Sequence, residues 1–327
     1  MADSLTACMK REEYMSFKAF KTALACTLSA AMLLGAAACG TKDEATSGSG
    51  SGSSSSSSTT GYDVSGIKKD ASIAAMLPDS VTKDGKLTVG MELTYAPAEF
   101  LKEDGKTPVG YDVDLSNALG KVFGLDTQIV SASFDSIVPS VGSKYDLGIT
   151  SLTITKERMD AVNFVSYYKA GATWVVKKGN PQKVDTSDLC GKKIAVQTGT
   201  VEEEDANKAA KQCKTDGKKP LEVLSSKLQT DAATNVVTGK ADVFYADSPV
   251  AGYAISQTDG QLQALGKDEG SVKQGIAIAK NDDQTTKAVQ KAVQKLMDDG
   301  TYMKILKHWG VQSGALDKAE INPTDLS

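Results

Sequence analysis

The residues with the most evident binding chemistry lie in one short segment, TSLTITKER, at 150–158. Arg158 carries a planar guanidinium whose parallel N–H donors match the two oxygens of a carboxylate, a geometry that lysine cannot offer. Arg158 could also be an ordinary surface residue that pairs with Glu157 or Asp160 beside it. The residue types alone therefore leave a carboxylate site and a surface ion pair both open.

Composition argues against several other kinds of chemistry. The chain of 327 residues has one histidine, His308, which leaves no histidine pair for a metal and no evident Ser-His-Asp set. We therefore expect neither a metal nor a cofactor. Its 37 basic and 41 acidic residues give a net charge of -4 without a basic run that could neutralise a phosphate backbone, so nucleic acid is not an expected partner. The length suits two domains of ordinary size.

Residues 1–39 have the features of an export signal. Two lysines precede an uncharged, mostly apolar stretch at 22–38, which meets small residues just before Cys39. The sequence around Cys39 resembles a bacterial lipobox, in which the cysteine becomes the lipidated first residue of the mature protein. An uncleaved membrane anchor is the alternative, although a spanning helix needs about 20 apolar residues. Met15 opens a more typical signal than Met1, so translation could start there.

The cysteines fit the same compartment. If Cys39 carries lipid and Cys8 and Cys26 leave with the signal, Cys190 and Cys213 remain as the one free pair. Outside the cytosol these two could form a disulfide, which would stabilise the fold by about 3 kcal/mol in the chain-entropy model. Two unlinked thiols are the alternative.

A low-complexity segment precedes the body of the chain. Residues 40–61 are almost entirely Ser, Gly, Thr and charged residues, including SGSGSG followed by six serines. Such a segment cannot bury apolar surface, so it is predicted to be a flexible tether. A short amphipathic stretch at 67–77 predicts a helical extension within 62–80.

Short β-rich runs alternate with helical patterns from Lys86 onward. Helices are predicted at 112–124, where Leu115 and Leu119 share a face, and at 283–298. The alternation implies parallel sheets with helices on their faces, and such sheets bind ligands at the carboxyl ends of their strands. Strands are predicted at 86–90, 127–132, 146–150, 173–177, 193–197, 241–246 and 275–279.

Eight segments of this chain occur in the order seen in family 3 solute-binding proteins, the polar amino-acid receptors of ABC transporters. The resemblance spans about 86–310. The segments are GMELTYAPAEF (90–100), VGYDVDL (109–115), SFDSIVPS (133–140), YDLGITSLTITKER (145–158), NFVSYY (163–168), VQTGT (196–200), ADSPV (246–250) and DGTYMKILKHWG (299–310).

The resemblance implies an α/β chain with the two-lobed, type II periplasmic-binding-protein-like fold. Two parallel or mixed sheets flanked by helices would be joined by two hinge strands and would close on the ligand. Lobe 1 is then expected from 81–167 and 274–316, lobe 2 from 168–273, and a C-terminal tail at 317–327.

The resemblance also implies how a free amino acid would be held. A pocket that dries on closure must compensate both the carboxylate and the ammonium. Arg158 would bind the carboxylate, with Ser151 and Thr153 from the same segment. From lobe 2, Thr200 would offer backbone N–H groups at a helix N-terminus, with Gln197 at the border of the site. Ser151 and Thr153 could instead cap the local turn.

Four further residues match family positions around the rest of the ligand. Asp247 would pair with the ammonium, although an Asp before Ser-Pro could simply form a turn. Tyr95 and Phe134 would be aromatic walls, although either could belong to the core. Glu92 aligns with an acidic position that in some relatives contacts a basic or amide side chain. We therefore favour Arg, Lys, ornithine or Gln over an acidic ligand.

The sequence thus predicts a lipid-anchored, extracytoplasmic, monomeric receptor that docks on an ABC permease and is not an enzyme. An enzyme related to cyclohexadienyl or arogenate dehydratase is the alternative on the same fold. Such an enzyme needs a positioned acid, for which Glu92 and Asp247 are conceivable. The sensor domain of a receptor is a third possibility, but no membrane helix follows the domain in this sequence.

Overall fold

The computed structural model describes residues 60–327. The predicted signal at 1–39, the lipidation of Cys39 and nearly all of the tether at 40–61 lie outside the described residues. Within the described part, no helix combines the length and the apolar character that a membrane crossing requires.

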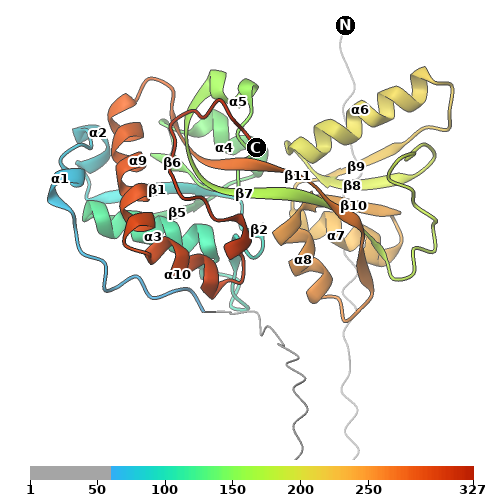
Figure 1. Ribbon diagram of the computed structural model, residues 1–327, viewed down its shortest axis with the longest axis horizontal. Helices are drawn as coiled ribbons and strands as arrows, with labels where there is room; N and C mark the ends of the chain where they lie inside the picture. Colours follow the sequence, from blue (N-terminus) through green and yellow to red (C-terminus); the bar gives the residue numbers. More distant parts are fainter. Residues whose placement is uncertain (1–59) are drawn as a thin grey trace, which may run out of the picture. The chain divides into compact units, whose positions relative to one another are not determined.

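Lobe 1, as we use the term for the structure, is built on β1 (Lys86–Met91). This strand pairs in parallel with β5 (Asp126–Ser131) on one side and β6 (Leu147–Gly148) on the other. Figure 1 shows α3 and α10 on one face of these strands and α4 and α5 on the other. The residues predicted to face the core from α3, such as Leu115 and Leu119, are buried. The lobe 1 helices are α3 (Tyr111–Phe123), α4 (Phe134–Ser140), α5 (Lys156–Ala161), α9 (Asp283–Asp298) and α10 (Thr301–His308).

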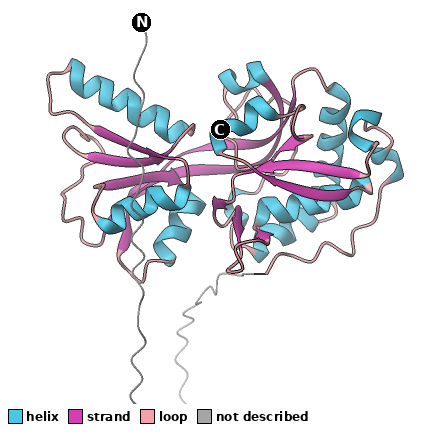
Figure 2. Ribbon diagram, turned by 180° about the vertical axis from the view of Figure 1, so that it is seen from behind, coloured by secondary structure: helices cyan, strands magenta, loops and turns pink. Residues whose placement is uncertain are grey.

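Lobe 2 is built on β8 (Lys193–Gln197), which lies between β9 (Glu222–Ser226) and β10 (Val243–Asp247) and is parallel to both. One helix covers one face of these strands and two cover the other (Figures 1 and 2). These are α6 (Val201–Thr215) on the first face, and α7 (Gln229–Thr238) with α8 (Ser248–Ser256) on the second.

Two long antiparallel strands, β7 (Val162–Lys177) and β11 (Leu262–Ala279), run from one lobe into the other (Figure 1). They connect all the strands above into one eight-stranded order, β5-β1-β6-β11-β7-β10-β8-β9. The sequence predicted only 173–177 and 275–279, which are opposite ends of this pair. The middle of β11 is exposed and contains the charged run KDE at 267–269, so the hydrophobic pattern of a strand is missing there. The pairing is also irregular there, with three register shifts between Leu265 and Gly275.

Shorter elements complete the molecule. The predicted helical extension contains α1 (Ala71–Ala74), and α2 (Asp79–Thr82) follows it. A small antiparallel sheet consists of β2 (Thr94–Tyr95), β3 (Glu99–Leu101) and β4 (Pro108–Val109).

The C-terminal tail lies along both crossing strands. The backbone N–H of Ser166 donates to the carbonyl of Glu320 at 2.9 Å, and Asn322 donates to Phe164 at 2.9 Å. Lys273 of β11 donates to the carbonyl of Leu326 at 2.8 Å. The tail therefore packs against the two strands that join the lobes.

Cys190 and Cys213 form a disulfide with a Cα–Cα distance of 5.5 Å. It joins the loop before β8 to α6, and Cys213 is buried in the lobe 2 core. Of the two alternatives that the sequence left open, the structure has the bonded one.

Candidate functional site

The predicted site residues lie at the carboxyl ends of parallel strands from both lobes. Glu92 follows β1 and Ser151 follows β6, whereas Thr200 follows β8 and Asp247 ends β10. This is the edge at which sheets of this type place their ligands. Alternating strands and helices therefore bring together residues that are far apart in the sequence.

Arg158 links the two lobes. It lies on α5, whose N-terminus is capped by the Thr155 hydroxyl. Its Nη1 donates to the carbonyl of Thr153 at 2.7 Å, and its Nη2 donates to the carbonyl of Gly199 in lobe 2 at 2.9 Å. The guanidinium carbon lies 5.6 Å from the centre of the Phe134 ring, within reach of a cation–π interaction. Burial lowers the pKa of Arg158, but a guanidinium stays charged in proteins.

The surface ion pair that the sequence left open for Arg158 does not form. None of the ion pairs within residues 60–327 includes this side chain. Its donors face the boundary between the lobes instead.

Asp247 is the buried anion on the lobe 2 side. Its Oδ2 accepts from the Tyr95 hydroxyl of lobe 1 at 2.7 Å and from Nε2 of Gln274 at 2.9 Å. Asp247 is the N-cap residue of α8, but its side chain makes no capping hydrogen bond to that helix. Its carboxylate is therefore not used to form the turn before Ser-Pro. Burial raises the pKa of Asp247 to about 6, while Tyr95, Gln274 and Arg158 act in the opposite direction.

Glu92 is a second buried carboxylate, 2 % exposed. It accepts from the hydroxyl of Thr94 at 2.8 Å and, across the boundary between the lobes, from Nε2 of Gln197 at 3.0 Å. Burial raises its pKa. The rings of Tyr95 and Phe134 are stacked nearby with their centres 6.5 Å apart, so both aromatic residues are buried beside the charged groups.

The three hydroxyl residues are arranged differently from one another. Ser151 has a left-handed backbone with φ of 50°, and its N–H and hydroxyl both donate to Asp112 inside lobe 1. Thr153 contributes its backbone carbonyl to Arg158. Thr200 is the N-cap of α6 and accepts from the N–H of Glu203. Of these hydroxyls, that of Ser151 is thus bound to the interior of lobe 1 and that of Thr200 to its own helix.

Two buried polar residues at this site escaped prediction from the sequence. Glu202, in the first turn of α6, is 4 % exposed, and burial followed by repulsion from Asp247 raises its pKa to about 8. It belongs to the acidic run EEED, which is typical of a solvated helix face. Gln274, 1 % exposed, lies in β11 within no chemical motif. No local signal distinguishes either residue.

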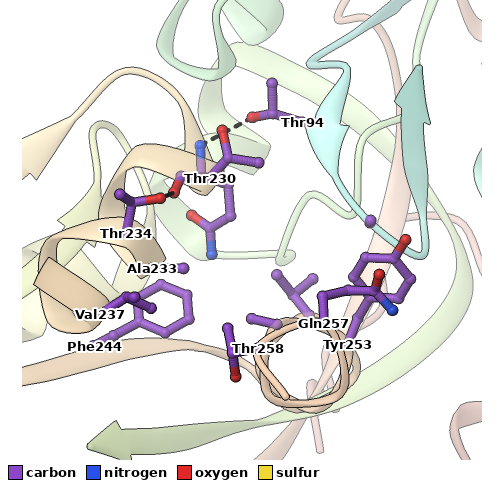
Figure 3. A pocket seen from close by; sticks show the side chains of 13 residues that line it. Thr94, Thr230, Ala233, Thr234, Val237, Phe244, Tyr253, Gln257 and Thr258 are labelled. Atoms are coloured by element: carbon purple, nitrogen blue, oxygen red, sulfur yellow. Dashed lines mark hydrogen bonds between the residues drawn. The ribbon is translucent and has the colours of Figure 1, made fainter. Parts of the chain in front are cut away.

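An apolar pocket of about 260 Å³ lies beside this cluster (Figure 3). It is lined by α7, α8 and the β2 region, and residues such as Thr230, Phe244 and Tyr253 surround it. Thr94 stands between the pocket and Glu92, because its hydroxyl donates to Glu92 and accepts from the N–H of Gln229 at 2.9 Å. None of the predicted site residues lines this pocket.

Comparisons with known proteins identify similar sequences and structures. The model of the bacterial extracellular solute-binding proteins, family 3, matches residues 87–312. The arginine-binding protein ArgT of Corynebacterium glutamicum is 34 % identical over 257 residues, which are 78 % of this chain and 84 % of that protein. The structure of an ancestral arginine-binding protein bound to arginine is 33 % identical with a TM-score of 0.64, covering 69 % of this chain and 98 % of that one.

A third similar structure bears on the alternative prediction. It is that of the ancestral amino acid-binding protein AncCDT-1, a precursor of cyclohexadienyl dehydratase. It is 31 % identical with a TM-score of 0.63, over 71 % of this chain and 98 % of that one.

Proposed function

Because this chain belongs to the family 3 bacterial extracellular solute-binding proteins, we propose that it captures a free amino acid with a basic or amide side chain and delivers it to an ABC permease. The observation that carries the proposal is a pair of opposite charges at the boundary between the lobes, the half-buried Arg158 and the buried Asp247. Arg158 of lobe 1 and Asp247 of lobe 2 each make a hydrogen bond to the other lobe. Lipid on Cys39 and the tether at 40–61 would hold the receptor, a monomer, at the outer surface of the membrane.

The two charges match the two charges that every free amino acid carries. The ligand carboxylate binds Arg158, because an anion is a stronger acceptor for the guanidinium fork than the neutral carbonyls of Thr153 and Gly199. The N–H groups at Thr200 contribute from the start of α6. The ligand ammonium binds Asp247, since an ammonium buried without an anion would cost several kcal/mol.

The preference for a basic or amide side chain rests on Glu92. Its buried carboxylate accepts from the neutral Thr94 and Gln197 and has no cationic partner within the described part of the chain. A cationic ligand end would supply one, whereas an acidic ligand would add a second anion. The name of the Corynebacterium glutamicum relative and the arginine in the ancestral structure support this choice.

Closure of the lobes is the proposed mechanism of capture. Glu92 contacts Gln197, Tyr95 contacts Asp247 and Arg158 contacts Gly199, so each contact joins opposite lobes. The crossing strands would bend where their pairing is irregular, and the closed form would dock on the permease.

A dehydratase on the same scaffold is the second candidate. It is favoured by Glu202, a buried acid whose raised pKa of about 8 suits proton donation near neutral pH. Glu202 and Asp247 would then be the acids of interest. Turnover of prephenate or arogenate by the purified chain would decide for this reading.

The test of the receptor proposal is isothermal titration calorimetry against the twenty amino acids, ornithine, citrulline and cystine. We expect tight binding of a basic or amide amino acid, loss of binding in Arg158→Ala, and unchanged binding in Lys156→Ala. Lys156 is an exposed cation on the same helix and is therefore the matched control. No binding across the panel by folded protein would overturn the proposal.

A further inference from the structure

Two carboxyl groups inside lobe 1 have no role in the proposed clamp, by which we mean the binding of the ligand carboxylate by Arg158 and of the ligand ammonium by Asp247. Glu99 lies on β3 and Asp112 lies in the first turn of α3, and both are 0 % exposed. The turn before α3 brings them together, because the N–H of Asp112 donates to the carbonyl of Ala98 at 2.9 Å. Gly110 permits this approach, since a Cβ at that position would lie 2.0 Å from the same carbonyl oxygen. The two carboxyl groups act on each other, since the charge of Asp112 raises the pKa of Glu99.

Each carboxyl group also supports a residue of the proposed ligand site. On one side, the N–H of Glu92 donates to the Thr150 hydroxyl at 3.1 Å, which in turn donates to Oε1 of Glu99 at 2.6 Å. On the other side, Oδ2 of Asp112 accepts from the N–H of Ser151 at 2.9 Å and from the Tyr167 hydroxyl at 2.7 Å. Hydrogen bonds therefore run from Glu92 to Glu99 on one side and from Asp112 to Ser151 on the other, and a bond between the two carboxyl groups would join them.

Every hydrogen bond named above has an identified donor, but one oxygen of each carboxyl group is left without one. Oε2 of Glu99 and Oδ1 of Asp112 receive no N–H or O–H donor from the protein. Two carboxyl groups can hydrogen-bond to each other only when one of them carries a proton, because an ionised carboxylate is an acceptor alone. Two buried anions side by side would repel each other strongly.

We propose that Glu99 and Asp112 share one proton at neutral pH, carried on Oε2 of Glu99 and donated to Oδ1 of Asp112, and that this bond positions Glu92 and Ser151 for ligand binding. The proton belongs on Glu99, because Asp112 is the better stabilised anion. Asp112 accepts from Ser151 twice and from Tyr167, whereas Glu99 accepts from Thr150 alone. Burial raises the pKa of Glu99 well above its usual range and that of Asp112 only to about 6.

No cation within residues 60–327 forms an ion pair with Glu99 or Asp112. The titratable groups that interact with the pair are acids or phenols, so removal of the shared proton would leave two adjacent anions. These groups are Glu92 after β1, Tyr111 on α3, Tyr167 and Tyr168 on β7, and Asp247 at the end of β10.

The first test observes the proton directly and needs no ligand. The infrared difference spectrum of wild type minus Glu99→Gln at pH 8 should contain the C=O band of a protonated carboxylic acid. Glu202 is present in both samples, so its contribution cancels. If the difference spectrum shows only ionised carboxylate, Glu99 carries no proton and the inference is wrong.

The second test measures positioning and rests on the proposed function. Glu99→Gln keeps an acceptor for Thr150 and a donor for Asp112, so its affinity for arginine at pH 7 should stay within about threefold of wild type. Between pH 7 and 9 the wild-type affinity should fall more steeply than that of Glu99→Gln. Glu99→Met, which keeps the volume but not the bonds, should bind at least tenfold more weakly at every pH. Equal affinity in Glu99→Met would refute the positioning role.

The two tests also separate the two proposals. If the wild-type chain binds no amino acid but shows the infrared band, the proposed function fails while the shared proton stands.

Discussion

Asp247→Asn should stabilise the ligand-free fold and weaken ligand binding. In the folded chain, burial raises the pKa of Asp247 from 3.8 to about 6. The folded state therefore holds this proton more tightly than the unfolded chain does. The stability that the protonated form contributes is complete below about pH 4 and is lost as the pH rises through 6. The rise of this pKa from 3.8 to about 6 corresponds to about 3 kcal/mol of stability at pH 7.5, because a tenfold change in proton affinity is worth about 1.4 kcal/mol.

An asparagine removes this cost and preserves the local hydrogen bonds. Its Oδ1 can accept from Tyr95 and Gln274, as Oδ2 of Asp247 does. We expect the free energy of unfolding, measured by urea denaturation, to rise by about 2 to 3 kcal/mol at pH 7.5 and to be unchanged near pH 4. Loss of the anion should weaken amino-acid binding by 2 to 5 kcal/mol, measured by calorimetry. A variant that is less stable than wild type at pH 7.5, or that binds normally, would refute this reasoning.

Three other perturbations test separate parts of the molecule. Arg158→Lys should weaken binding at least tenfold, since an ammonium cannot match both oxygens of a carboxylate; calorimetry that shows equal affinity would contradict the fork geometry. Replacement of Cys190 and Cys213 by serine should lower the free energy of unfolding by about 3 kcal/mol without changing affinity, because the bond closes a loop of 23 residues. Deletion of 317–327 should lower the free energy of unfolding by about 1 kcal/mol for each backbone hydrogen bond lost to β7 and β11, and should therefore lower the melting temperature. An unchanged melting temperature in calorimetric scans would show that the tail is dispensable.

Elements with a strong local pattern were predictable from the sequence. The helix predicted at 283–298 and the strand predicted at 193–197 have these bounds in the structure, and the helix predicted at 112–124 is α3 (Tyr111–Phe123). The two helices each have an apolar face that is buried within lobe 1, and the strand is buried throughout 194–197. The crossing strands were predicted only in part. The middle of β11 is exposed and charged, whereas residues 162–168 of β7 are all buried, so neither stretch has the alternating pattern of a strand with one buried face.

The site was predictable where a residue stands in a recognisable segment and unpredictable where its role comes from distant neighbours. Arg158 and Asp247 fall within such segments. Glu202 and Gln274 are buried polar residues whose common neighbour is Asp247, which comes from a third element, β10. Glu99 lies within one of the family-like segments, yet its place beside Asp112 depends on the turn before α3 and not on its own sequence.

The most direct test of the clamp leaves the protein unchanged and uses ligands that lack one of the two charged groups. Calorimetry of the wild-type chain should be run with L-arginine, with agmatine, which lacks the carboxylate, and with Nα-acetylarginine, which lacks the ammonium. We expect tight binding of arginine and at least a hundredfold weaker binding of both analogues, because each analogue leaves Arg158 or Asp247 without its charged partner inside the closed site. Comparable binding of all three would show that the chain recognises only the side chain, and would contradict the clamp.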